Sequence, residues 1–246
     1  MPEPRGTALL IHGAWQGSWV WASQIPALEA AGWRAVAPDL PGNGADGRPP
    51  GAVRFADHVA CASAIVEAAD GPVAVIAHSG GGVLATQLAE DHPDRIAGVI
   101  YVCGMMLPSG VSFPDFVAPF VEADQAAIGI TAHLQVVAGG TVVPPEAACA
   151  VFYHDAEPAA AKAAAARLTP QGDAVRAPRV HFTDARAGRV PRGYVRCGAD
   201  RSVLPAVQDA MCAARPGARR VPLDCGHAPM LAAPTALSAT LLHLLP

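Results

Sequence analysis

The sequence predicts an α/β fold with a mostly parallel central sheet, helices on both faces of that sheet, and one helical insertion. Short apolar runs bounded by glycine and proline alternate with stretches of helical periodicity. At 246 residues, the chain is long enough to bury one large core without a second independent domain. The alternation stops once, between residues 107 and 189, where helical patterns follow one another without a convincing buried strand.

The strands and helices of the core are expected to alternate along the chain. Apolar runs predict strands at residues 8–11, 34–37, 73–77, 98–103, 193–197 and 219–223. Helical patterns predict helices at residues 21–31, 56–69, 82–90, 204–213 and 235–245. Because the strands alternate with helices along most of the chain, a parallel arrangement covered on both faces follows.

The stretch without strands is predicted to form a cap. Helices are expected there at residues 113–127, 145–152 and 158–168, where the last contains an alanine-rich run with Pro158 near its first turn. An insertion that leaves the carboxyl end of a strand lies over the sheet edge where ligands bind. Residues 1–106 and 190–246 therefore form the expected core, and residues 107–189 the expected cap.

Composition excludes several classes of function. The net charge of −4 and the scattered Lys and Arg side chains offer no basic face for nucleic acid. No apolar run reaches the length of a membrane span, and the first residues lack a secretory-signal pattern, so a cytoplasmic protein without membrane contact is expected. The six cysteines lie far apart with no zinc spacing, which favours buried thiols and predicts neither a metal nor a cofactor.

The clearest chemical signal is the string Ala-His-Ser-Gly-Gly at residues 77–81, directly after the strand predicted at residues 73–77. A sharp turn from strand to helix would lift the Ser79 hydroxyl clear of the sheet as a nucleophile. Ala77 and Gly81 are expected to face each other across this turn, where larger side chains would clash. A helix cap or a phosphate-binding loop is the alternative interpretation, but the lysine of a phosphate loop is absent after the glycines.

A serine nucleophile needs a base and an acid that orients the base. His227 follows the last predicted strand and Asp200 follows the strand before it, so both reach the same sheet edge as Ser79. Asp224 could turn back toward His227, but its place at a strand end favours a structural role. Asp39 is interpreted as a turn former.

Acyl transfer also needs backbone donors at the oxygen that becomes negative. We expect these donors to be the N–H of Gly80, directly after the nucleophile, and the N–H of Ala14, in the loop after the first strand. His12 is expected to brace this loop rather than exchange protons. Of the nine histidines, His78, His92 and His243 are also assigned structural roles.

Several motifs together resemble one known family. These are Leu-Ile-His-Gly-Ala-Trp at residues 10–15, Asp-Leu-Pro-Gly at residues 39–42, His-Pro-Asp-Arg-Ile at residues 92–96, and Gly-His-Ala-Pro-Met-Leu at residues 226–231. The chain resembles the α/β-hydrolase branch that contains methyl-salicylate-type esterases, hydroxynitrile lyases and their bacterial relatives. The resemblance implies an α/β-hydrolase fold, a triad of Ser79, Asp200 and His227, and a site without a cofactor.

One departure from the lyases of this branch favours an esterase. In those lyases a lysine follows the catalytic histidine and a threonine follows the histidine of the oxyanion loop, whereas this chain has Ala228 and Gly13. A serine hydrolase acting through an acyl-enzyme on a small to medium ester with an apolar or aromatic part is therefore expected. Trp15 and Phe120 are the predicted substrate-binding residues, although such aromatic side chains are as often core.

Two other functions fit the same residues. A natural-product tailoring enzyme could use this site for lactonisation, cyclisation or carbon–carbon cleavage, because function belongs to the site rather than to the fold. A ligand-binding protein with an inactive triad is the less favoured alternative. The sequence leaves the oligomeric state open, with a homodimer among the options, and predicts a small-molecule substrate as the main partner.

Overall fold

The protein is described by a computed structural model that covers residues 5–246. Six strands form one sheet in the order β2-β1-β3-β4-β8-β9, and every neighbouring pair is parallel. The strands are β1 Gly6–Ile11, β2 Trp33–Val36, β3 Val73–His78, β4 Ile96–Val102, β8 Arg192–Cys197 and β9 Arg219–Leu223. All six lie where the apolar runs predict them, to within two residues at either end. The α/β class and the parallel sheet are therefore confirmed.

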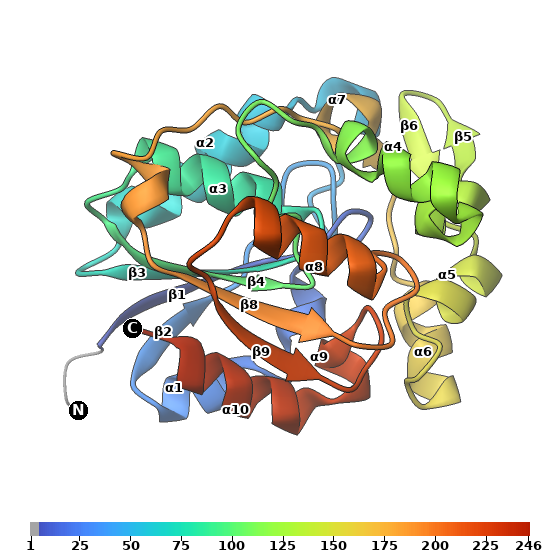
Figure 1. Cartoon of the computed structure of the whole chain (residues 1–246). Coiled ribbons are helices and arrows are strands. Elements are labelled where there is room, and N and C mark those ends of the chain that lie inside the picture. Colours follow the sequence, from blue (N-terminus) through green and yellow to red (C-terminus); the bar gives the residue numbers. More distant parts are fainter. Residues whose placement is uncertain (1–4) are drawn as a thin grey trace.

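Side chains alternate between the two faces of the sheet, as the strand period of two requires. Leu9 and Val75 enter the core on one face, and Leu10 and Ile76 enter the core on the other. Figure 1 shows one face covered by α2 Phe55–Ala68, α3 Gly81–Asp91 and α8 Pro205–Ala214. The opposite face is covered by α1 Ile25–Ala30 and α10 Pro234–Leu244. Because helices cover both faces of the sheet, the central strands β1, β3 and β4 are buried and mostly apolar along their length.

Short helical elements differ from the expected pattern at three places in the chain. The helix predicted at residues 21–31 is a 3-10 turn, η1 Ser18–Trp21, followed by the shorter α1. Pro26 lies in the first turn of α1, where its missing N–H costs no helical hydrogen bond, so the helix begins there. The short helix α9 Pro229–Ala232 precedes α10, and the 3-10 turn η2 Pro50–Ala52 precedes α2.

The segment between β4 and β8, residues 107–189, is called the inserted segment below. Figure 1 places its helices beyond the ends to which the β8 and β9 arrows point. Its helices are α4 Phe113–Ala123, α5 Pro145–Val151, α6 Pro158–Ala165 and α7 Asp173–Arg176, with 3-10 turns η3 Gln125–His133 and η4 Ala187–Arg189.

The expectation of an inserted segment without strands is wrong. It contains an antiparallel sheet of three short strands, β5 Gln135–Val137, β6 Gly140–Val142 and β7 Gln171–Gly172. Strands of two or three residues are too short to show alternation. In addition, β7 pairs with β6 across a long stretch of chain, so no local pattern marks it.

The helix expected at residues 113–127 ends earlier, at Ala123. Asp124 is extended, with φ −148°, and its side chain accepts a hydrogen bond from the Ala126 N–H, which begins η3. An aspartate at a helix N-cap takes this extended conformation, so it ends one helix and starts the next.

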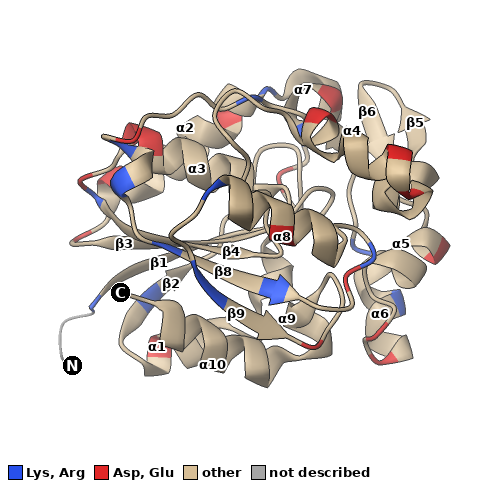
Figure 2. Ribbon diagram, in the orientation of Figure 1, with Lys and Arg blue, Asp and Glu red and all other residues tan. Residues whose placement is uncertain are grey.

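Charged residues are spread over the periphery of the fold rather than gathered on one face, as Figure 2 shows. Within residues 5–246, none of the helices combines the length and the apolarity that crossing a membrane requires.

Candidate active site

Ser79 occupies the sharp turn between β3 and α3. Its φ is +50°, a left-handed conformation that costs a non-glycine residue about 1–3 kcal/mol. Main-chain hydrogen bonds hold it there: its N–H donates to Val102 O at 3.1 Å, and its carbonyl accepts from Gly82 at 3.0 Å and Met105 at 2.9 Å. The strained turn therefore directs the hydroxyl away from the sheet.

The crowding at this turn differs from the expected arrangement. A Cβ on Gly81 would lie 2.7 Å from His12 O and 2.8 Å from Ile11 Cγ2, and Ala77 is not among its nearest neighbours. The sequence correctly requires a glycine, but the clash it avoids is with the end of β1. The reason is that β1 pairs with β3, so the first turn of α3 passes over the neighbouring strand.

Ser79, His227 and Asp200 lie in hydrogen-bond contact. His227 Nε2 is 3.1 Å from Ser79 Oγ, and His227 Nδ1 is 2.8 Å from Asp200 Oδ2. Asp200 follows β8 and His227 follows β9, so three strand ends deliver the three side chains to one edge. Asp200 is 2% exposed and His227 is 1% exposed, which shields their interaction from water.

The Asp200 carboxylate has four hydrogen-bond donors. Its Oδ1 accepts from the N–H groups of Ser202 at 2.7 Å and Val203 at 2.9 Å. Its Oδ2 accepts from His227 and from Gln208 Nε2, which is 3.2 Å away. A buried carboxylate that accepts four hydrogen bonds is fixed in orientation, so the imidazole it contacts is fixed as well.

A second layer of buried side chains supports the main chain of His227. His78 Nε2 donates to the His227 carbonyl at 2.8 Å, and Cys103 Sγ donates to the same oxygen at 3.3 Å. Burial holds the pKa of His78 well below its ordinary value and raises the pKa of Cys103 to about 12. Hydrogen bonding to Cys197, together with burial, also raises the pKa of Cys225. Neither thiol is therefore a ready nucleophile.

The same cluster contains the potential metal ligands His78, Cys103 and His227, each with a donor atom within 4.8 Å of the others. Both ring nitrogens of His227 face Ser79 and Asp200. A metal bound through this ring would replace one of those hydrogen bonds, so the cluster does not fit a metal alongside the observed contacts.

In the loop after β1, one backbone N–H has no hydrogen-bond acceptor among residues 5–246. The Gly13 N–H donates to Gln16 Oε1 at 3.1 Å, and the Trp15 N–H donates to Gln171 Oε1 at 2.9 Å. Within residues 5–246, the Ala14 N–H has no hydrogen-bond acceptor, and neither has the N–H of Gly80. A Cβ on Gly80 would lie 3.8 Å from the Ala14 nitrogen, so the two predicted donors are neighbours.

His12 braces this loop, as expected from the sequence. Its Nδ1 lies 2.8 Å from Gly13 O, and its Nε2 accepts from the Leu40 N–H at 3.1 Å. Burial lowers the pKa of His12 to about 4. The ring is therefore neutral at pH 7 and links two loops without exchanging protons.

Neither of the rival acids, Asp39 and Asp224, is hydrogen-bonded to His227. Asp39 accepts from the N–H groups of Ser18 at 2.6 Å and Ala45 at 2.9 Å, which confirms its role in the turn. Asp224 is exposed, and the carboxylate that contacts His227 is Asp200.

A cavity of about 140 Å³ opens beside Ser79. The core contributes part of its wall, including Trp15 and Leu84, and the inserted segment contributes the rest. The lining residues from the inserted segment are Phe113, Pro114, Ile128, Ile130, Thr131, Leu134, Phe152, Gln171, Val175, Arg176, Ala177 and Pro178. The lining contains no Asp or Glu.

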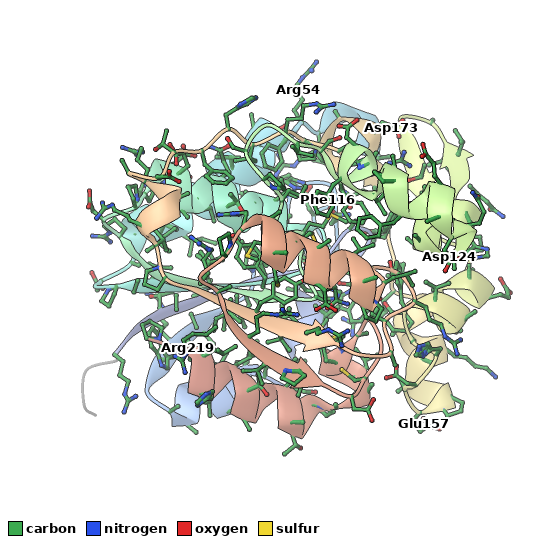
Figure 3. The ribbon with its side chains drawn as sticks, in the orientation of Figure 1. Arg54, Phe116, Asp124, Glu157, Asp173 and Arg219 are labelled. Atoms are coloured by element: carbon green, nitrogen blue, oxygen red, sulfur yellow. The ribbon has the colours of Figure 1, made fainter. Side chains whose placement is uncertain are left out.

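Of the two aromatic residues expected to bind substrate, only Trp15 lines the cavity. Phe120 does not line it: its ring stacks on Phe116, labelled in Figure 3, with centroids 6.2 Å apart, and packs against a separate hydrophobic cluster. The two residues are one helical turn apart on α4 and share a face, whereas Phe113 at the start of α4 lines the cavity.

Sequence reasoning missed several residues from the inserted segment. Asp155 Oδ2 accepts a hydrogen bond from the Gly226 N–H, next to His227. His154 Nε2 donates to the carbonyl of Ala199, next to Asp200, at 2.9 Å. No motif marks these two residues, because their partners lie far along the chain. Arg176, which lines the cavity from the inserted segment, was missed for the same reason, as was His58, which lines it from α2.

The fold and this constellation define an α/β-hydrolase. The chain belongs to the alpha/beta hydrolase family, whose model matches residues 8–240.

Two relatives illustrate the range of similarity. A pyrethroid hydrolase from Sphingobium wenxiniae is 35% identical over 112 residues, which is 45% of this chain and 40% of that protein. Methylesterase 7 from Arabidopsis thaliana is 26% identical over 251 residues, which is 96% of this chain and 95% of that protein. The resemblance to the methylesterase branch is thus confirmed. Across the first relatives, the matched stretch spans well under half of their length.

Solved structures agree over the whole chain. A crystal structure of a pyrethroid hydrolase from Sphingobium faniae superimposes with a TM-score of 0.83 at 26% identity, covering 96% of each chain. The superposition therefore includes the inserted segment as well as the core.

Proposed function

We propose that this protein is a serine hydrolase that cleaves carboxylic esters through an acyl-enzyme. The observation that carries the proposal is the hydrogen-bonded chain from Ser79 Oγ through His227 to Asp200, at 3.1 Å and 2.8 Å, beside a mostly apolar cavity. Relatives named as hydrolases and esterases support it.

In the first half of the reaction, Ser79 Oγ attacks the ester carbonyl carbon while His227 Nε2 takes the hydroxyl proton. The carbonyl oxygen becomes negative and accepts hydrogen bonds from the free N–H groups of Ala14 and Gly80. Asp200 holds the His227 tautomer in which Nε2 is the acceptor, and it stabilises the imidazolium that forms.

In the second half, the bond between the carbonyl carbon and the alcohol oxygen breaks, and His227 gives its proton to the leaving alkoxide. The acyl group remains on Ser79. His227 then takes a proton from water, the hydroxide attacks the acyl carbon, and the acid leaves as Ser79 recovers its proton.

The expected substrate has a small or medium apolar or aromatic part. A cavity of about 140 Å³ is comparable with the ~150 Å³ cavity that holds a benzene molecule in another protein, so one ring or a short chain fits. Trp15, Phe113 and Phe152 provide aromatic wall. We propose that the inserted segment acts as a cap, because it supplies much of the wall and limits access of water to the acyl group.

The test is hydrolysis of a panel of aryl and methyl esters by the purified protein. We expect turnover that falls by about 10⁴-fold in Ser79→Ala, with the acyl group found on Ser79 by mass spectrometry. Equal turnover by Ser79→Ala would overturn the proposal. Tight ligand binding without any turnover would instead support the alternative of an inactive, ligand-binding triad.

Product analysis separates hydrolysis from lactonisation, cyclisation or carbon–carbon cleavage. In water enriched in oxygen-18, hydrolysis of the acyl-enzyme places one heavy oxygen in the acid product. Lactonisation, cyclisation and non-hydrolytic carbon–carbon cleavage release products without it, so its absence would favour a tailoring enzyme. Hydrolytic carbon–carbon cleavage also takes up the heavy oxygen, but it is recognised by the broken carbon–carbon bond in its products.

A further inference from the structure

Among residues 5–246, the wall of the cavity contains a single arginine and no Lys, Asp or Glu. The titratable side chains in the lining are four histidines and one arginine, and Arg176 at the end of α7 is that arginine. Burial lowers the pKa of His12 to about 4 and lowers the pKa values of His58 and His78 below their ordinary range. His227 is the base of the proposed reaction. Arg176 therefore supplies the one guanidinium of a wall that contains no carboxylate among residues 5–246.

The guanidinium of Arg176 lacks an acidic partner. Its one side-chain hydrogen bond goes from Nη1 to Thr141 Oγ1 at 3.3 Å, and it forms no ion pair with a carboxylate of residues 5–246. Asp173, labelled in Figure 3, lies on the same short helix but does not pair with it. Several other arginines do pair with carboxylates, namely Arg48, Arg179, Arg186, Arg189, Arg196 and Arg220.

The contacts of Thr141 place this cation near the reaction site. Trp15 Nε1 donates to Thr141 O at 3.1 Å and lies 3.3 Å from the same hydroxyl that Arg176 contacts. Trp15 directly follows Ala14, a proposed donor to the oxyanion. The guanidinium is thus linked to the oxyanion loop through a single buried threonine.

We propose that Arg176 forms a carboxylate-binding subsite, so that the substrates are esters carrying a carboxylate at the end remote from the cleaved bond. The proposal rests on the ester hydrolase function above and names its substrate class. A guanidinium offers several N–H donors in one plane, which match the two oxygens of a carboxylate. Arg176 is itself exposed, so water competes for its guanidinium, but among residues 5–246 no carboxylate lines the cavity to compete with that of a substrate.

A matched pair of substrates tests this subsite. The 4-nitrophenyl monoesters of adipic, pimelic and suberic acids carry a free carboxylate, and the corresponding monoesters with a terminal carboxamide are neutral and similar in shape. We expect kcat/KM to be at least tenfold higher for the carboxylate than for the carboxamide at the best chain length. In Arg176→Met this ratio should fall to about one, through a higher KM for the carboxylate ester.

The matched control is Arg34→Met, which removes an exposed arginine on β2, outside the cavity, and should keep the wild-type ratio. A wild-type ratio of one or below at every chain length, with the carboxamide esters hydrolysed, overturns the subsite and leaves the hydrolase function standing. A ratio that survives in Arg176→Met overturns it as well.

Calorimetry provides a readout without turnover. With Ser79→Ala as the background, the carboxylate ester should bind at least tenfold more tightly than the carboxamide ester, and adding Arg176→Met should abolish the difference. Equal binding of the two esters overturns the subsite even where no hydrolysis is seen. Failure of the hydrolase function itself shows differently, as equal turnover by wild-type protein and Ser79→Ala.

Discussion

The edge of the parallel sheet and the inserted segment build the site in different ways. At the sheet edge, Ser79, Asp200 and His227 directly follow regular strands, and main-chain hydrogen bonds fix the turns that hold them. The inserted segment has short helices and strands of two or three residues, and it contributes mainly walls. The proposed reacting groups thus lie on the regular part, and much of the cavity wall lies on the irregular part.

The two regions are joined by a few specific hydrogen bonds. The Trp15 carbonyl accepts from the Thr169 N–H at 2.8 Å, and the Trp15 N–H donates to Gln171. Asp155 contacts Gly226 beside the base. The inserted segment therefore also holds the loops of the sheet edge in place, and the separation of roles is incomplete.

The largest predicted effect lies in the sheet edge. Asp200→Asn should lower kcat for a hydrolysed aryl ester by about 10³-fold or more, or ~4 kcal/mol, because the amide no longer selects the required His227 tautomer. Steady-state kinetics with the aryl ester measure this change in kcat. Asp209→Asn makes the same change on the surface of α8 and should stay within twofold of wild type. A loss below tenfold in Asp200→Asn would contradict the assigned role.

The unfolding free energy is expected to depend on pH through His12, the buried histidine in the loop after β1. The folded state keeps His12 neutral down to a pKa of about 4, whereas the unfolded chain binds the proton near pH 6.5. The unfolding free energy should therefore fall as pH drops from 6.5 to 4, with about 3 kcal/mol due to His12.

Denaturant unfolding at several pH values measures this slope. His12→Gln keeps an acceptor for the Leu40 N–H and should flatten the slope, whereas His133→Gln, at an exposed position, should keep it. An unchanged slope in His12→Gln would show that other groups dominate.

A smaller effect is expected where the two regions meet. Asp155→Ala should lower kcat about tenfold with little change in KM, because the Gly226 N–H loses its acceptor and the loop holding His227 shifts. Asp155→Asn retains an acceptor oxygen and should restore most of kcat. If both variants lose activity equally, the carboxylate charge rather than the positioning hydrogen bond is what matters.

The smallest effect concerns the strain at the turn. Ser79→Gly should unfold with a free energy about 1 kcal/mol higher than Ser79→Ala, because glycine adopts a φ of +50° without steric cost. Thermal or denaturant unfolding measures the difference. Ala163→Gly, on the exposed face of α6, should instead lose about 1 kcal/mol, so the two glycine substitutions change stability in opposite directions.

Much of this molecule follows from local sequence. Continuous apolar runs such as residues 73–77 predict buried parallel strands, because a strand with helices on both faces has no polar side. The small residues around Ser79 predict the sharp turn, and the positions of Asp200 and His227 after strands predict that they reach the same edge. These inferences succeed because parallel strands bring their carboxyl ends together whatever the loops contain.

Tertiary structure alone decided the rest. The cavity wall, the short sheet of the inserted segment, the exclusion of Phe120 and the contacts of Asp155 and Arg176 depend on pairs of residues distant in sequence. No periodicity encodes such pairs, since short irregular elements take their positions from packing against neighbours rather than from their own pattern. The sequence therefore determined the sheet and the position of the reacting groups, and the packing of the inserted segment determined the surroundings that a substrate meets.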